Sequence, residues 1–244
     1  MSAAMLLGLL IEAAAGWPAN LHARIGHPVV WIGHLITLCE RSLNVGSAQA
    51  RRLMGVATLI IVLCVSAGLA ALVASVLPGG WIGVVLTGVL AWPFIAARSL
   101  NDHVAAVAKP QLQGDLSAAR IAVSMIVGRN AQTLDSEAIN RAALESLAEN
   151  ASDGVIAPLF WGGILGLPGL VAYKALNTAD SMIGHRNARY QDFGWAAAKL
   201  DDLANLIPAR LTALLIALAT GRFAHVLTIT RRDAHQHRSP NAGW

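Results

Sequence analysis

The 244-residue chain is 55% hydrophobic and only 13% charged, with a mean hydropathy of +0.55. Soluble domains carry about 25% charged residues, so this balance argues against one and predicts an all-α, polytopic membrane protein. The formal net charge is +4, and the seven Trp, four Phe and two Tyr form no aromatic and basic stripe on which bases could stack. We therefore expect no nucleic-acid partner.

The N-terminal segment predicts a helix that enters the membrane. Residues 1–15 are apolar with a single acid, Glu12, and lack the basic start and the cleavage site of a signal peptide. The segment 16–18, Gly-Trp-Pro, is expected to end this helix. A second helix should begin after His27, because a proline disfavours helical geometry in the residue before it. His27 and His34 could share a helix face, but we expect each to pack and hydrogen-bond locally.

Residues 53–97 predict a transmembrane hairpin. As a helix, the uncharged run 53–77 would span roughly 37 Å, more than the ~30 Å hydrocarbon core of a bilayer. The segment 78–80, Pro-Gly-Gly, should turn the chain, and residues 81–97 should return with a kink near Pro93. Basic residues flank the hairpin on one side, which the positive-inside rule makes cytoplasmic. They are Arg51, Arg52 and Arg98.

Residues 101–153 are expected to form amphipathic helices in the cytoplasm or on the membrane surface. Pro110 and Gly114 split the segment, and Asp115 is a suitable N-cap for a helix that ends at Gly128-Arg129. Arg120 lies outside the apolar face of that helix. The face consists of Leu116, Ala119, Val123, Ile126 and Val127.

Residues 155–221 are expected to form broken spans that hold the site, within a single membrane domain of residues 1–244. Residues 155–173 are uncharged but contain two prolines and four glycines, so a straight span is not expected. Broken or re-entrant backbone at membrane depth is tolerated where it lines a protein cavity. Residues 203–221 predict a kinked or partial span, because Pro208 and Arg210 lie near one end.

Most of the acid in the chain lies around this uncharged segment. The four-residue spacing of Arg141, Glu145, Glu149 and Asp153 predicts a single stripe on one helix. Two further polar clusters follow, at residues 174–186 and 201–210. The structural alternative is a solvated acidic face, or an ion-pair network such as one between Arg141 and Glu145.

These clusters resemble a known family. The blocks RAALESLAENASDGVIAPLFW, AYKALNTADSMIGHR and LDDLANLIPARLTA are similar to motif blocks of the adenosylcobinamide-phosphate synthases, and they occur in that family's order. The resemblance runs from about Ile11 to the last residue. It implies a membrane enzyme of cobalamin biosynthesis. Such an enzyme uses ATP and Mg²⁺ to join a propionate carboxylate of a cobyric-acid corrinoid to aminopropanol or its phosphate.

The sequence departs from the family's pattern in places. Glu12 and Trp17 stand where the family has acids in an Asp…Gly-Asp-Pro…His-Pro-Val block. The pair Arg129-Asn130 replaces the family's Arg-Asp, and an asparagine cannot act as a base. Residues 231–244 resemble an Arg-Asp…His…Ser-Pro-Asn block, after which the family continues with more helix. We therefore expect a chain truncated relative to the family, and an inactive homologue is one alternative.

The implied reaction needs three kinds of residue. An amide forms from a carboxylate and an amine only after activation, which requires acids that hold Mg²⁺, cations for phosphate charge, and a proton acceptor. The chain supplies all three, although spacing does not distinguish one carboxylate from another. The candidates are Glu145, Glu149 and Asp153 for catalysis, Lys174, Asn177, Arg186 and Arg210 for substrate binding, and Asp180, Asp201 and Asp202 for the metal.

Other functions remain open at this point. ATP use rests on the resemblance alone, because the sequence has no glycine-rich nucleotide motif, and Cys39 and Cys64 have no metal or redox spacing. A transporter would also use a broken helix near charges, although no paired half-repeats are visible. The pair Asp201-Asp202 alone is weak support for a membrane transferase.

The expected partners are the corrinoid, the amino alcohol or its phosphate, and membrane lipid. A partner chain or homo-oligomer is left open. The expected location is the bacterial inner membrane, with the site facing the cytoplasm.

Overall fold

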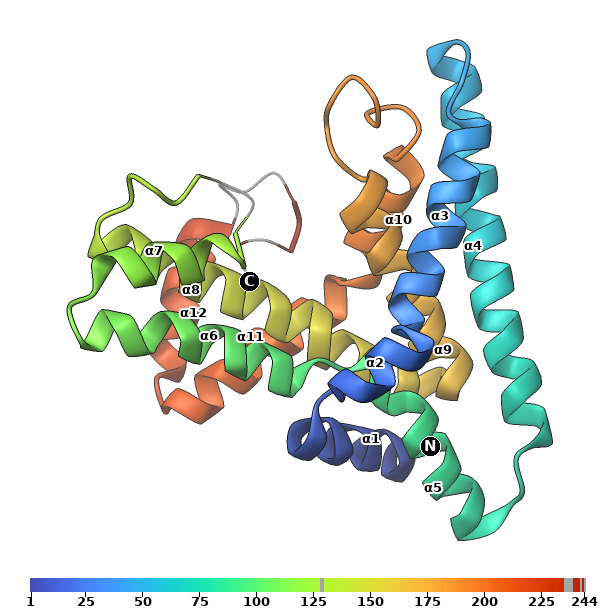
Figure 1. The fold of residues 1–244 in the computed structure, drawn as a ribbon, viewed down its shortest axis with the longest axis horizontal. Helices are drawn as coiled ribbons and strands as arrows, with labels where there is room; N and C mark the ends of the chain where they lie inside the picture. The colour runs from blue at the N-terminus through green and yellow to red at the C-terminus, as the bar shows by residue number, and fades with distance from the viewer. Residues whose placement is uncertain (128–129, 235–238, 242, 244) are drawn as a thin grey trace.

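The computed structural model describes residues 1–127, 130–234, 239–241 and 243, and all its regular secondary structure within these ranges is helical (Figure 1). The all-α fold class is therefore confirmed. Within these described ranges, three helical stretches are long and apolar enough to cross a membrane, or up to five if each bent pair is one span. The helices are α1 (Ser2–Ala15), α2 (Ala19–Ile25), α3 (Pro28–Leu43), α4 (Ala48–Val76), α5 (Gly80–Ala91), η1 (Trp92–Phe94), α6 (Ala97–Leu112), α7 (Leu116–Ser124), α8 (Ser136–Ala151), η2 (Ser152–Ile156), α9 (Ala157–Ile183), α10 (Trp195–Ala204), α11 (Leu206–Thr220) and α12 (Phe223–Asp233).

Helix α4 is the longest of the described helices. Its 29 residues correspond to about 43 Å of helix, and it packs along α9 and α3 (Figure 1). The core between these helices includes Ile36, Val62 and Ala175. Apolar side chains cover much of the outer surface of α4, as expected of a helix that faces lipid.

The second leg of the predicted hairpin lies in the stretch Gly80–Leu112, which is long and apolar enough to cross a membrane but is divided near Pro93. The chain turns between Val76 and Gly80, but α5 has only 12 residues and packs mainly against α1. A 3₁₀ turn containing Pro93 ends it, which confirms the predicted kink, and Arg98 lies in the first turn of α6. Proline has no backbone N–H to donate and has a fixed φ, so it favours such a bend.

Helix α9 contains the broken segment that the sequence predicted. Gly166 has φ 69° and ψ −157°, which interrupts the helix. A Cβ atom at Gly162 would lie 3.1 Å from the Cβ of Leu170, although residues eight apart in a straight helix are about 12 Å apart. A side chain at Gly169 would likewise meet the carbonyl of Trp161. The chain therefore reverses sharply at Gly166, and only glycine fits these close approaches.

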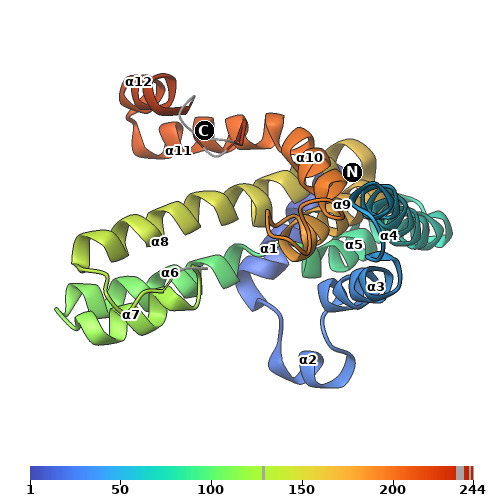
Figure 2. The same ribbon diagram turned by 90° about the horizontal axis from the view of Figure 1, so that it is seen from above.

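Helices α6, α7 and α8 form a bundle that projects away from α3 and α4 (Figure 2). The Asp115 carboxylate caps α7 by accepting a hydrogen bond from the Ala118 N–H at 2.9 Å, as predicted. Ala119 and Val123 are fully buried in the bundle core, which also takes Ile139 from α8. The apolar face of α7 thus packs against other helices of the chain. The sequence predicted that this segment ends at Gly128 and Arg129. Both residues lie outside the described residues.

Local contacts hold the N-terminal helices. Glu12 is buried, and its Oε2 accepts a hydrogen bond from the Arg98 N–H at 2.7 Å, which ties α1 to α6. His27 caps α3 by accepting from the Val29 N–H at 3.2 Å, and its ring meets the edge of Trp17 at 4.9 Å. His34 is exposed on α3. The expectation of local packing is confirmed for His27.

Candidate functional site

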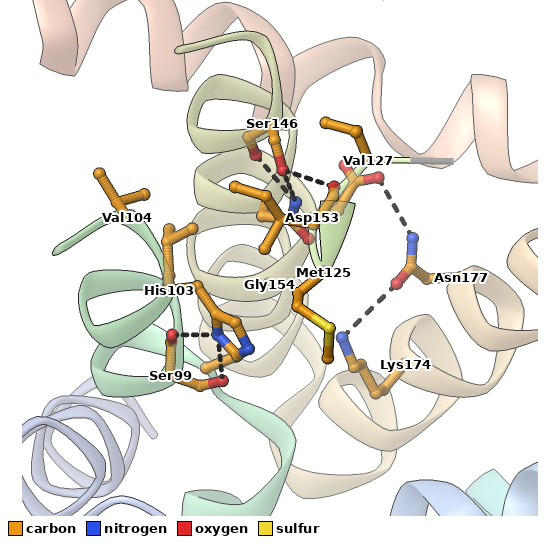
Figure 3. Close-up of a pocket in the computed structure, with 14 residues that line it drawn as sticks. Ser99, His103, Val104, Met125, Val127, Ser146, Asp153, Gly154, Lys174 and Asn177 are labelled. Atoms are coloured by element: carbon orange, nitrogen blue, oxygen red, sulfur yellow. Dashed lines mark hydrogen bonds between the residues drawn. The ribbon is translucent and has the colours of Figure 1, made fainter. Parts of the chain in front are cut away.

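A cavity of about 490 Å³ opens where the projecting bundle meets α9 (Figure 3). Its walls come from α6, the segment after α7, the end of α8, η2 and α9. Apolar wall residues include Val104 and Met125. The polar lining consists of Ser99, His103, Ser146, Asn150, Asp153, Lys174 and Asn177.

A π-helix brings Asp153 into this cavity. The α8 helix widens at η2, and the N–H of Ala96 donates to the Gly154 carbonyl at 3.0 Å, which holds η2 against the start of α6. A π-turn adds a residue to one helical turn and so shifts the side chains that follow it. Glu145 and Glu149 are exposed and do not line the cavity, whereas Asp153 does. The predicted acidic stripe is therefore broken at its last member.

The ion pair suggested for the stripe is wrong. Arg141 pairs with Glu137, at 2.9 Å between its Nη2 and the Glu137 Oε1. Glu137 and Glu145 are each four residues from Arg141, one before it and one after it. Spacing alone therefore did not decide which of them pairs with Arg141. The Arg141–Glu137 pair is largely exposed, and such pairs contribute about 0–1 kcal/mol to stability.

Asn177 joins the two charged groups of the cavity. Its Nδ2 donates to the Asp153 Oδ2 at 3.2 Å, and its Oδ1 lies 3.5 Å from the Lys174 Nζ (Figure 3). Lys174 and Asn177 are three residues apart on α9 and so share a face. Three of the residues predicted from the sequence thus meet at one cavity.

A second polar network lies behind this wall. The Tyr173 hydroxyl donates to the Asn205 Oδ1 at 2.8 Å, and the Asn205 Nδ2 donates to the Asp201 Oδ2 at 3.0 Å. Asp201 is 8% exposed, and its Oδ1 is buried with no hydrogen-bond partner among the described residues. A buried carboxylate oxygen in this condition fits a cation or a donor supplied from outside the chain.

The predicted metal ligands do not form a three-residue cage. Within residues 1–127, 130–234, 239–241 and 243, no three His, Cys, Asp or Glu side chains lie close enough to hold a metal ion together. Asp180 and Asp201 do interact electrostatically. The Asp202 Oδ1 accepts from the Ser239 hydroxyl at 2.8 Å. Mg²⁺ commonly uses one or two protein carboxylates together with substrate phosphates, so Asp201 with Asp180 still fits it.

Arg186 and Arg210 lie outside the cavity lining. Arg210 is on α11 and donates to the Leu206 carbonyl at 2.6 Å. Arg186 is exposed in the loop between α9 and α10, and about 14 Å of helix separates Lys174 from the end of α9 at Ile183. The structure therefore places neither cation in the lining of the cavity that holds Asp153 and Lys174.

The loop of residues 184–194 is anchored to α3 and α4. The Arg189 guanidinium makes two hydrogen bonds of 2.9 Å to the Glu40 carboxylate, which raises the pKa of Arg189. Arg51 pairs with Asp192 at 2.7 Å, and the Arg52 guanidinium lies 3.8 Å from the Trp195 ring centroid. These contacts place the loop at the start of α4.

Sequence reasoning missed the α6 side of the cavity. Ser99 and His103 lie one turn apart on α6, and the His103 Nδ1 is 2.6 Å from the Ser99 carbonyl oxygen. Their four-residue spacing was the available signal, but the segment was interpreted only as an amphipathic face. Asn150 was also missed, although it lies in the first block of the family resemblance, beside Glu149. Its Nδ2 donates to the Ser146 carbonyl at 2.8 Å.

The chain is similar to known proteins over almost its whole length. Residues 5–244 match the family model described as CobD/Cbib protein. The chain is 57% identical over 243 residues to the cobalamin biosynthesis protein CobD of Rhodobacter capsulatus strain ATCC BAA-309. The match covers 100% of this chain and 77% of that relative. It is 51% identical to the CobD of Brucella suis biovar 1 and 46% identical to that of Rhizobium meliloti strain 1021, covering 98% of this chain and 76% of each relative. No solved structure matches it significantly. The expected resemblance is confirmed, and the chain belongs to the CobD/CbiB family of cobalamin biosynthesis proteins.

Proposed function

We propose that this protein is an ATP-dependent ligase. It would join a carboxylate of a cobyric-acid corrinoid to the amino group of aminopropanol or its phosphate. Membership in a family of cobalamin biosynthesis proteins supports the proposal. The observation that carries it is the meeting of Asp153, Asn177 and Lys174 at one cavity.

Asp153 is our candidate for the proton acceptor. An amine attacks as the free base, so a proton must leave the nitrogen before or as the C–N bond forms. The bond between the carboxylate carbon and its activating phosphate then breaks, and the phosphate leaves with the electron pair. Asp153 lines the cavity, and its Oδ2 is already oriented by Asn177. A positioned acid or base of this kind contributes about 10²–10⁴ in rate.

Lys174 supplies positive charge for an anionic group of the substrate. Its ammonium lines the same cavity as Asp153. Asp201, whose Oδ1 is buried without a hydrogen-bond partner among the described residues, would hold Mg²⁺, which would offset phosphate charge when bound. Glu145, Glu149, Arg186 and Arg210 are less well placed for the chemistry, because none of them lines the cavity.

An assay of the purified chain tests the reaction. The protein in detergent or nanodiscs is mixed with cobyric acid, 1-amino-2-propanol or its phosphate, ATP and Mg²⁺. We expect ADP release and a new amide, detected by mass spectrometry, and both should stop when either substrate is omitted or EDTA is added. Growth of a synthase-deleted strain on cobyric acid gives the matching result in cells. Substrate flux into liposomes without ATP consumption or amide product would identify a transporter and contradict the proposal.

We further propose that the protein lies in the bacterial inner membrane with its cavity open toward the cytoplasm. Residues 53–97 carry no charge, whereas Arg51 and Arg52 begin α4 beside the anchored loop that holds Arg186 and Arg189. The positive-inside rule makes that end cytoplasmic. Lys174 neighbours Ala175, which packs in the core cluster with Leu59 and Val62, and these α4 residues are nearer to Arg51 than to Gly79.

Cysteine labelling tests this orientation. In a background with Cys39→Ala and Cys64→Ala, Gly79→Cys should react with an impermeant thiol reagent in intact cells. Ala188→Cys, in the exposed loop at the opposite end, should react only after the cells are opened. The reverse pattern would place the arginine-rich end outside.

A further inference from the structure

One surface of the molecule, outside the cavity, combines two basic side chains with an exposed tryptophan. The Arg52 guanidinium lies over the Trp195 ring, 3.8 Å from its centroid. Trp195 and Lys199 are four residues apart on α10 and therefore share a helix face. All three side chains are exposed, and none of them lines the cavity. We call Arg52, Trp195 and Lys199 the basic surface.

The positive charge of the basic surface is not neutralised within the chain. In the part of the chain that the structure describes, neither Arg52 nor Lys199 forms an ion pair. The acids nearby in the sequence, Asp192 and Asp202, hydrogen-bond to other residues. Stacking uses the flat face of a guanidinium, so the N–H groups in its plane stay available to an anion. The basic surface therefore offers two cations to a ligand from outside.

Helix α10 runs alongside α4 in the same direction, starting from this basic surface. Gly55 of α4 lies against the backbone of Phe193. Four residues later on each segment, Leu59 and Ala197 belong to one core cluster, which also holds Val62. Helix α10 therefore follows α4 from its charged end into its apolar part.

Farther from the charged end, both helices expose apolar side chains. Leu203, about two turns after Trp195, is 61% exposed, and Ile60, about two turns after Arg52, is 56% exposed. Tryptophan and basic residues gather at the boundary between lipid headgroups and hydrocarbon, whereas exposed aliphatic side chains of a spanning helix face the acyl chains. Charge at one end of this flank and apolar surface beyond it match the two parts of a lipid. A soluble acidic partner would match only the charged end.

We propose that the basic surface binds the headgroup of an anionic phospholipid, such as phosphatidylglycerol, whose acyl chains lie along the exposed flank of α4 and α10. The phosphodiester oxygens accept hydrogen bonds from the in-plane N–H groups of Arg52 and from the Lys199 ammonium. The Trp195 ring lies at the level of the headgroup. This lipid site is separate from the proposed reaction, because no residue of the basic surface lines the cavity.

Quenching of Trp195 fluorescence tests the proposal. The full chain is placed in phosphatidylcholine vesicles that contain an increasing fraction of lipid with brominated acyl chains, which quench tryptophan on contact. The brominated lipid is either phosphatidylglycerol or phosphatidylcholine. The Trp195 signal is the difference between the protein and its Trp195→Phe variant. Because two cations contribute, we expect half-maximal quenching at a phosphatidylglycerol fraction at least about tenfold lower than the phosphatidylcholine fraction.

Charge variants assign the preference to the basic surface. Arg52→Gln and Lys199→Gln, each compared with its own Trp195→Phe partner, should raise the phosphatidylglycerol fraction needed by about fivefold. Lys199→Arg keeps the charge and should stay close to the unaltered value. The matched control Arg141→Gln removes an exposed positive charge from the projecting bundle and should change nothing. Thermal unfolding in lipid-free detergent shows whether each variant is folded.

Four results would overturn the proposal. The first is equal quenching of Trp195 by the two brominated lipids in the unaltered protein. The second is an unchanged lipid preference in folded Lys199→Gln, a residue that makes no ion pair in the described part of the chain. The third is loss of the preference in Arg141→Gln, which would attribute it to net charge. The fourth is release of the quenching by an equal concentration of soluble sn-glycerol 3-phosphate, which would identify a site for free anions.

Discussion

Replacing Asp153 by asparagine is expected to lower turnover by roughly 10²–10⁴ while the protein remains folded. Asparagine has nearly the same shape, and its Oδ1 can still accept the hydrogen bond that Asn177 donates. The change therefore removes the charge and the proton-accepting oxygen without opening the cavity. The measurement is kcat for amide formation at saturating substrates, with thermal unfolding of the same preparation.

Two further variants on the same helix serve as controls for Asp153→Asn. Glu149→Gln removes an exposed acid outside the cavity lining, and Glu137→Gln removes one from the exposed pair with Arg141. Both should keep kcat within a few-fold of the unaltered protein. If Glu149→Gln lowered kcat as much as Asp153→Asn, the catalytic acid would belong to the stripe on α8 and not to η2.

Gly55→Ala is expected to destabilise the protein strongly, whereas the same change at Gly68 on α4 is not. Gly55 is buried, and a Cβ atom there would collide with the backbone carbonyl of Phe193, which lies in the anchored loop of residues 184–194. Backbone cannot rotate away as a flexible side chain can, so α4 and the loop must separate. Overpacking of this kind costs about 1–3 kcal/mol, occasionally more. Thermal unfolding in detergent should show a clearly lower Tm.

Gly68→Ala provides the matched control on the same helix. Gly68 is exposed, and a Cβ atom there would have no neighbour within 4 Å. The substitution should be neutral or raise stability by about 0.5–1 kcal/mol, because alanine favours helix more than glycine does. Equal Tm values for Gly55→Ala and Gly68→Ala would mean that α4 does not pack against the backbone at Phe193.

The features predicted well from the sequence depend on local chemistry. An uncharged run of 25 residues predicts a long apolar helix wherever it occurs, and α4 follows from it. Asp115 caps α7 because its side chain reaches an N–H only three residues away. The cluster of glycine and proline around Gly166 predicted a break for the same reason, since proline and glycine disfavour regular helix whatever surrounds them.

The features missed depend on contacts between distant segments. Ser99 and His103 line the same cavity as Lys174, although they are more than 70 positions away from it in the sequence. No periodic pattern in the sequence predicts that they come together. The packing of α5 against α1 was not predicted, because these two helices lie far apart along the chain. Spacing alone did not separate Asp153 from Glu145 and Glu149 as catalytic candidates, because a straight helix was assumed.

Because of the π-helix at Ser152–Ile156, the number of residues between α8 and α9 matters as much as which residues they are. One residue corresponds to about 100° of rotation around a helix axis. A relative with one residue fewer between α8 and α9 would keep the same acids, amides and glycines, yet would turn its acid away from the cavity or carry that acid at a neighbouring position. Comparison of family members should therefore count residues through this turn as carefully as it matches their identities.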